Sequence, residues 1–211
     1  MAIMLSNVIF FHMPRTGGTW LSSILKANFS HAKLGYKHMT PRELSVPIDK
    51  FKFGFIRNPV HWYISKFCAP THNRRLWTGM DSMNNPIFQL DALDLDESFA
   101  DWVRRHLRAR PGWLTWYHKW FYGHNYRLVD FIGQYERRVR HLRKVLLLAG
   151  QEMPLKFKRK RRRFQRSDEE RKATCLYPRR VLANLIEQEK PIFERFGYPT
   201  DVDYYAELIN L

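Results

Sequence analysis

The chain has 211 residues, 45% of them hydrophobic and 15% aromatic, which is enough apolar material for one packed domain and excludes a chain that is disordered throughout. Lysine and arginine exceed aspartate and glutamate by 36 − 20, giving a formal net charge of +16 that favours anionic partners such as nucleotides, nucleic acids, acidic glycans or a membrane surface. The two cysteines, Cys68 and Cys175, lack C-x-x-C spacing, which disfavours a zinc site and a disulfide framework.

The N-terminus predicts a buried strand rather than a targeting segment. Residues 1–14 (MAIMLSNVIFFHMP) have no basic start and only a short apolar run, which is not typical of a signal peptide or membrane anchor. No other stretch is apolar enough to span a bilayer. We therefore expect a soluble, cytoplasmic protein.

Three short apolar runs predict the strands of a sheet. They are residues 8–12 (VIFFH), 51–56 (FKFGFI) and 128–135 (LVDFIGQY). Helices are predicted between and after them, at residues 19–28, from a capping box at 40–43, and at 59–67, 95–108, 112–122, 137–149 and 178–196, with irregular chain at 74–94 and a further capping box at 167–170. Strands alternating with helices predict an α/β fold whose central parallel sheet is flanked by helices, in a single domain over residues 1–211.

The loop after the first predicted strand has the composition of a phosphate-binding loop. Two glycines permit a tight turn, and the helix that follows presents free N–H groups to an anion. Arginine and threonine add side-chain donors. The candidate binding residues are Arg15, Thr16, Gly17, Gly18, Thr19 and Trp20. No Lys-Ser/Thr pair follows Gly18, so this is not a Walker A loop.

The segment VIFFHMPRTGGTWL resembles the 5′-phosphosulfate-binding loop of sulfotransferases that use 3′-phosphoadenosine-5′-phosphosulfate (PAPS), commonly written PKTGTTWL or HIPKTAGTS. The resemblance implies a three-layer, P-loop-like α/β fold. It also implies that Arg15, standing where the family carries lysine, neutralises charge on the departing phosphate, and that Trp20 lies near the adenine. Arginine keeps the charge of lysine but changes its geometry.

A second motif follows the second predicted strand. Arg57, Asn58 and Pro59, with Ser65 eight residues after Arg57, match an R-[DN]-P element with a spaced serine. Ligands collect at such strand ends in open α/β sheets. The sulfotransferase family carries such an element and uses its arginine and serine to hold the 3′-phosphate of PAPS. The resemblance therefore implies this role for Arg57 and Ser65.

Two further segments resemble the same family less closely. FIGQYERRVRHLRKVLLLAG (residues 131–150) is similar to the family's IGRFE segment, and PIFERFGYP (residues 191–199) is similar to its C-terminal end. Residues 74–125 match nothing in the family, as an acceptor-binding region would. The aromatic side chains at 113–122 favour a packed helix over a sugar platform.

Sulfuryl transfer to a hydroxyl requires a base. His38 is our first candidate, because YKHMTPREL resembles an H-x-T-x-x-E-L stretch of related sulfotransferases. His12 is a rival that we expect to hold loop geometry, and His118 and His124 could face an acceptor.

The basic run at residues 156–166 (KFKRKRRRFQR) holds eight cations in eleven residues. It is consistent with a solvated loop, with a contribution to the 3′-phosphate site, or with a site for a polyanionic acceptor.

The sequence therefore predicts an enzyme that transfers a sulfuryl group from PAPS to a hydroxyl or amine of a small-molecule or glycan acceptor, without a metal. The alternatives are a nucleotide kinase of the same fold, disfavoured by the missing Gly-Lys-Ser/Thr, and a basic nucleic-acid-binding protein, disfavoured because no known RNA or DNA module surrounds the basic run. The acceptor and the oligomeric state are left open.

Overall fold

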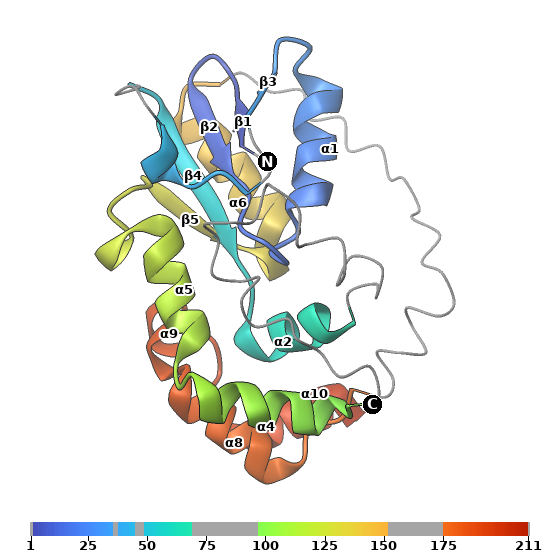
Figure 1. Cartoon of the computed structure of the whole chain (residues 1–211). Helices are drawn as coiled ribbons and strands as arrows, with labels where there is room; N and C mark the ends of the chain where they lie inside the picture. The colour runs from blue at the N-terminus through green and yellow to red at the C-terminus, as the bar shows by residue number, and fades with distance from the viewer. Residues whose placement is uncertain (1, 36–37, 45–48, 69–96, 152–174, 211) are drawn as a thin grey trace. The chain divides into compact units, whose positions relative to one another are not determined.

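A computed structural model describes residues 2–35, 38–44, 49–68, 97–151 and 175–210 (Figure 1). The chain divides into two compact units. The first, the sheet unit, comprises Met1–Arg57 and His118–Arg161, and the second, the helical unit, comprises Asn58–Tyr117 and Arg162–Leu211. A single functional domain over residues 1–211 stays a prediction.

The sheet unit contains five strands in the order β3-β1-β2-β4-β5. The strands are β1 (Ile3–Met4), β2 (Val8–Phe11), β3 (Lys33–Leu34), β4 (Phe51–Ile56) and β5 (Phe131–Gln134). β2, β4 and β5 pair in parallel, whereas β1 pairs antiparallel with both β2 and β3. The α/β class is confirmed. The prediction of a wholly parallel sheet is not confirmed, because β1 and β3 add an antiparallel edge. Each of these strands has two residues, which is too short for a periodic pattern in the sequence.

One face of this sheet is covered by α1 (Gly18–Asn28) and α6 (Arg138–Leu148), which lie next to the strands in Figure 1. Both helices contribute to one apolar core with alternate residues of β2 and β4. Its members include Val8, Phe10, Leu21, Leu25, Phe53, Phe55, Leu142 and Val145. Alternation follows from the period of two along a strand, which sends every second side chain to the same face.

The opposite face of the sheet carries Tyr122, at the end of α5 (Trp113–Tyr122). A Cβ added at Gly54 would lie 2.3 Å from Cε1 of Tyr122, so only glycine fits at this point of β4. The Tyr122 hydroxyl donates to the carbonyl of Phe55 at 2.9 Å and accepts from its N–H at 3.1 Å.

The helical unit is built around α8, which contacts α2, α4 and α10. Besides the first turns of α5, its helices are α2 (Pro59–Phe67), α4 (Phe99–Ala109), α8 (Arg179–Gln188), α9 (Lys190–Phe196) and α10 (Val202–Asn210). α2 has the bounds that the sequence predicts. Its start is fixed by proline at the first helical position and by Asn58, whose side chain accepts from the Val60 N–H at 3.0 Å.

Three short 3₁₀ helices lie in the described part of the sheet unit. They are η1 (Pro41–Glu43), η4 (His124–Tyr126) and η5 (Tyr135–Arg137). The predicted capping box at 40–43 is present, because the Thr40 N–H donates to the Glu43 carboxylate at 2.5 Å. The predicted capping box at 167–170 and the irregular chain at 74–94 lie outside the described residues.

The prediction of one long helix over residues 178–196 is wrong. The structure has α8 and α9 instead, separated at Glu189, whose φ of −98° and ψ of 11° depart from helical values. Pro191 follows two residues later. Proline has no N–H and its ring crowds the carbonyl four residues before it, which breaks a continuous helix.

Candidate functional site

The loop after β2 is shaped by two rings of the protein. Gly17 has a left-handed backbone with φ of 81°, and a Cβ there would lie 2.1 Å from Cε2 of Tyr135. A Cβ at Gly18 would lie 1.7 Å from Cδ2 of His12. Both positions therefore require glycine, as the motif indicates. The structure adds the close approach of these rings to the tight turn that the sequence predicts.

The other loop residues differ in where they lie. Thr16 is buried, and its hydroxyl donates to the Met13 carbonyl at 2.8 Å. This hydroxyl hydrogen is therefore used inside the loop and stabilises its turn. Thr19 is exposed in the first turn of α1, and Arg15 and Trp20 are half-buried. Thr19 and Arg15 are thus better placed than Thr16 to donate to a bound anion.

Two arginines and two aromatic rings form a strand-end cluster, which we define as Trp20, Arg57, Tyr135 and Arg138. The Cζ of Arg57 lies 4.9 Å from the centre of the Tyr135 ring. The Cζ of Arg138 lies 4.6 Å from the same ring and 5.1 Å from the Trp20 ring. Arg57 directly follows β4 and Tyr135 directly follows β5, so parallel pairing brings both to the edge where the β2 loop lies.

Tyr135 and Arg138 were not predicted as site residues. Their segment was noticed only as an echo of IGRFE, and the arrangement of two arginines around one ring depends on the pairing of β4 with β5. The Nε of Arg138 is buried and has no hydrogen-bond partner among the residues that the structure describes. A guanidinium with a buried, unsatisfied N–H at a strand end suits an anionic ligand.

His38 lies close to the β2 loop. It is 9% exposed, and its ring centre is 4.9 Å from that of His12. His38 Nδ1 lies 3.1 Å from the His12 carbonyl oxygen. Because a carbonyl only accepts, Nδ1 carries a hydrogen, and in the neutral ring Nε2 is the nitrogen that can take up a proton.

Both residues predicted as catalytic have an unusual backbone. Arg15 has φ of 66° and His38 has φ of 62°, and they are two of the four non-glycine residues with positive φ in the described ranges. This conformation costs roughly 1–2 kcal/mol per residue. Such strain is concentrated at functional sites.

The rival histidines have different surroundings. The His12 ring occupies the space beside Gly18, which supports its predicted role in holding the loop. Burial lowers the pKa of His118 to about 3, and neither of its ring nitrogens has a hydrogen-bond partner within the described part of the chain. His118 therefore stays neutral at pH 7 and is a poor base. His124 is exposed in η4.

The rest of the R-N-P motif belongs to the helical unit. The Asn58 amide donates to the Tyr205 hydroxyl at 2.6 Å and also caps α2, which gives this side chain a structural role. Ser65 is half-buried on α2. Arg57 ends a stretch of the sheet unit, so the convergence of Arg57 and Ser65 on one phosphate stays a prediction.

The aromatic segment at 113–122 forms core rather than a platform. Trp113, Tyr117, Phe121 and Tyr122 are buried, and Trp116 is 46% exposed. Trp113 and Tyr117 stack with ring centres 5.1 Å apart. This supports the interpretation of a packed helix.

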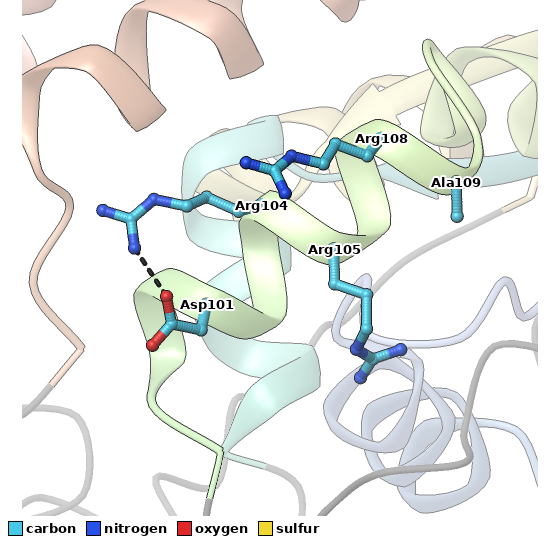
Figure 2. A pocket seen from close by; sticks show the side chains of 5 residues that line it. All are labelled: Asp101, Arg104, Arg105, Arg108 and Ala109. Atoms are coloured by element: carbon cyan, nitrogen blue, oxygen red, sulfur yellow. Dashed lines mark hydrogen bonds and ion pairs between the residues drawn. The ribbon is translucent and has the colours of Figure 1, made fainter.

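A hollow on α4 is lined by Arg104, Arg105 and Arg108 (Figure 2), and two of these arginines pair with carboxylates. Arg104 forms an ion pair with Asp101 at 2.6 Å. Arg105 binds Glu97 through two hydrogen bonds of 2.9 and 2.6 Å. These ion pairs reduce the positive charge that the hollow presents. The basic run at 156–166 lies outside the described residues.

The helical unit contains a buried polar centre at Glu189, which sequence reasoning missed. The carboxylate accepts from the Leu114 N–H at 2.9 Å, from the Thr115 N–H and hydroxyl at 2.8 and 2.7 Å, and from the Tyr63 hydroxyl at 3.1 Å. Leu114 and Thr115 lie in the first turn of α5, so Glu189 caps this helix from a distant part of the chain. Burial raises the pKa of Glu189.

Comparison with known proteins finds no matching family model, no similar curated protein and no similar solved structure. Within the described ranges, no three His, Cys, Asp or Glu side chains gather as ligands of one metal ion. None of the helices in those ranges has both the length and the apolar character needed to cross a bilayer.

Proposed function

We propose that this chain is a PAPS-dependent sulfotransferase with a three-layer, P-loop-like fold. The observation that carries the proposal is the edge formed by the ends of three adjacent parallel strands. The glycine loop follows β2, Arg57 follows β4, and Tyr135 with Arg138 follows β5. Cationic side chains and the N–H groups of a helix N-terminus along such an edge suit a nucleotide with phosphates at both its 3′ and 5′ positions.

The residues present fit such a donor. The first turn of α1 carries no acidic side chain, so no carboxylate there opposes an anion to which its N–H groups donate. The unsatisfied Nε of Arg138 supplies a directed donor, and the ring contacts of Arg57 and Arg138 orient their guanidinium planes. PAPS would supply the sulfuryl group.

The proposed chemistry uses two residues of the sheet unit. Arg15 would stabilise negative charge on the departing phosphate by preorganised electrostatics. His38 would accept the proton of the acceptor hydroxyl at Nε2, with the His12 carbonyl fixing the orientation and tautomer of its ring. Neither role needs a metal ion.

The acceptor would be a small molecule or glycan carrying a hydroxyl or amine, and the location would be cytoplasmic. A nucleotide kinase is disfavoured because the loop has no Gly-Lys-Ser/Thr. A nucleic-acid-binding protein is disfavoured because no known RNA or DNA module surrounds the basic run at 156–166.

Calorimetric titration with 3′-phosphoadenosine-5′-phosphate, beside ATP with magnesium at the same salt concentration, tests the proposal. We expect micromolar binding of the bisphosphate and much weaker binding of ATP. Arg57→Ala should weaken bisphosphate binding by at least about 30-fold, as expected when one partner of a charged contact is removed.

The matched control is Arg127→Ala. Arg127 is exposed and precedes β5, so it lies at the ends of the strands opposite to the proposed site. Its replacement removes the same charge as that of Arg57, but should change affinity by less than about threefold because of this distance. Failure of the bisphosphate to bind, tighter binding of ATP, or equal effects of the two substitutions would contradict the proposal.

A further inference from the structure

Cys68 and Cys175, which are 107 positions apart in the chain, lie side by side in the helical unit. Their Sγ atoms are 3.3 Å apart. Both cysteines are reduced and both are buried, Cys68 being 6% exposed and Cys175 fully covered. They are the only two cysteines in the sequence, and neither belongs to the proposed sulfotransferase site.

The backbone at both cysteines is held by neighbouring contacts. Cys68 caps the end of α2, with its N–H donating to the Ile64 carbonyl at 2.9 Å. Near Cys175, the Tyr177 hydroxyl donates to the Val60 carbonyl in α2 at 2.9 Å, and its ring packs on Phe99 with ring centres 4.7 Å apart. The two thiols are therefore neighbours because the packing around α2 holds them there.

We infer that Cys68 and Cys175 are a redox pair that forms an intramolecular disulfide under oxidising conditions. An S–S bond is about 2.05 Å long, so the sulfurs must approach by little more than 1 Å. With a small-molecule disulfide as oxidant, the thiolate of one cysteine attacks a sulfur of the oxidant and releases one thiol. The other cysteine then displaces the second thiol. The protein loses two electrons and two protons, and the oxidant becomes two thiols.

The bond would join the end of α2 to the segment that leads into α8. It closes a loop of more than 100 residues, which places it among the more stabilising disulfides in the chain-entropy account. Because both sulfurs are buried, we expect slow oxidation through local opening and slow reduction once the bond has formed. This inference does not depend on the proposed function.

The test is to incubate the reduced full-length chain with excess oxidised glutathione, denature it in alkylating reagent and measure its intact mass. The expected product is a monomer about 2 Da lighter than the reduced chain, with no alkylated cysteine and no glutathione adduct. Its melting temperature should be higher by roughly 10 °C, because a loop of this size contributes several kcal/mol. Cys68→Ser and Cys175→Ser, treated identically, should show no shift in melting temperature.

Three results would overturn the inference: two alkylated thiols after full equilibration, stable glutathione adducts, or a covalent dimer in place of the monomeric product. A disulfide that leaves the melting temperature unchanged or lower would also overturn it, because the bond would then have formed only by distorting the native packing. The wild-type chain itself carries the test, so poor folding of a serine variant would not affect the outcome.

Discussion

The strand-end cluster of the sheet unit and the Glu189 centre of the helical unit differ in how far their polar groups are satisfied by hydrogen bonds within the protein. In the cluster, Arg57 and Arg138 lie over aromatic rings, and contact with a ring face leaves the N–H edges of a guanidinium able to bind an anion. At Glu189, four donors of the protein converge on one buried carboxylate. A carboxylate whose hydrogen bonds are all made within the protein stabilises the fold, whereas the unsatisfied Nε of Arg138 is the feature on which the proposed anion site rests.

The largest expected effect is that of replacing His38, the proposed base of the sheet unit. We expect His38→Ala to lower turnover about 10²–10⁴-fold while leaving bisphosphate affinity nearly unchanged, because a base acts on the acceptor proton and not on the nucleotide. The measurement is release of 3′-phosphoadenosine-5′-phosphate from PAPS, with an acceptor found by screening phenols, alcohols and glycans. His31→Ala, which removes an exposed histidine of the same unit, is the control. Unchanged turnover in His38→Ala would remove the assignment.

The next largest effect is expected at Glu189. Glu189→Ala leaves the Leu114 and Thr115 N–H groups and the Tyr63 hydroxyl without their buried acceptor, which should lower the free energy of unfolding by about 3–5 kcal/mol. Urea denaturation measures this loss. Glu187→Ala, which removes an exposed glutamate near the end of α8, should stay within about 0.5 kcal/mol of the wild type. Equal losses in the two variants would show that Glu189 does not hold α5.

A smaller effect is expected in the pH dependence of the contribution of Glu189 to stability. Burial raises the pKa of Glu189 above its ordinary value of 4.5, so the folded chain keeps this proton to higher pH than the unfolded chain does. The contribution of Glu189 to stability should therefore fall as pH rises from about 4.5 through its folded pKa, by at most about 1.4 kcal/mol per pH unit.

The measurement is the difference in unfolding free energy between the wild type and Glu189→Gln across this range. The difference removes the contributions of Asp101 and Asp203, whose pKa values are lowered by hydrogen bonds from Ser98 and Arg179 respectively. Parallel pH profiles for the two proteins would contradict the raised pKa.

The local elements of this protein are determined largely by sequence. The bounds of β4 and α2, the glycine turn at 17–18 and the capping box at 40–43 all follow from patterns spanning fewer than ten residues. The candidate site was predicted to the same extent, since Arg15 and Arg57 stand next to strands that apolar runs identify. Local sterics and periodicity decide such features, so one stretch of chain contains the information.

The tertiary structure alone decided which distant groups meet. Tyr135 and Arg138 join Arg57 through the pairing of β4 with β5, the His38 ring is oriented by the carbonyl of His12, and Cys68 meets Cys175 across 107 positions of chain. The sequence pattern predicts Glu189 inside one long amphipathic helix over residues 178–196. The fold instead breaks the helix there and uses the carboxylate to cap α5. Burial and long-range hydrogen bonds override local propensity at such positions, because their free energies exist only once the chain has packed.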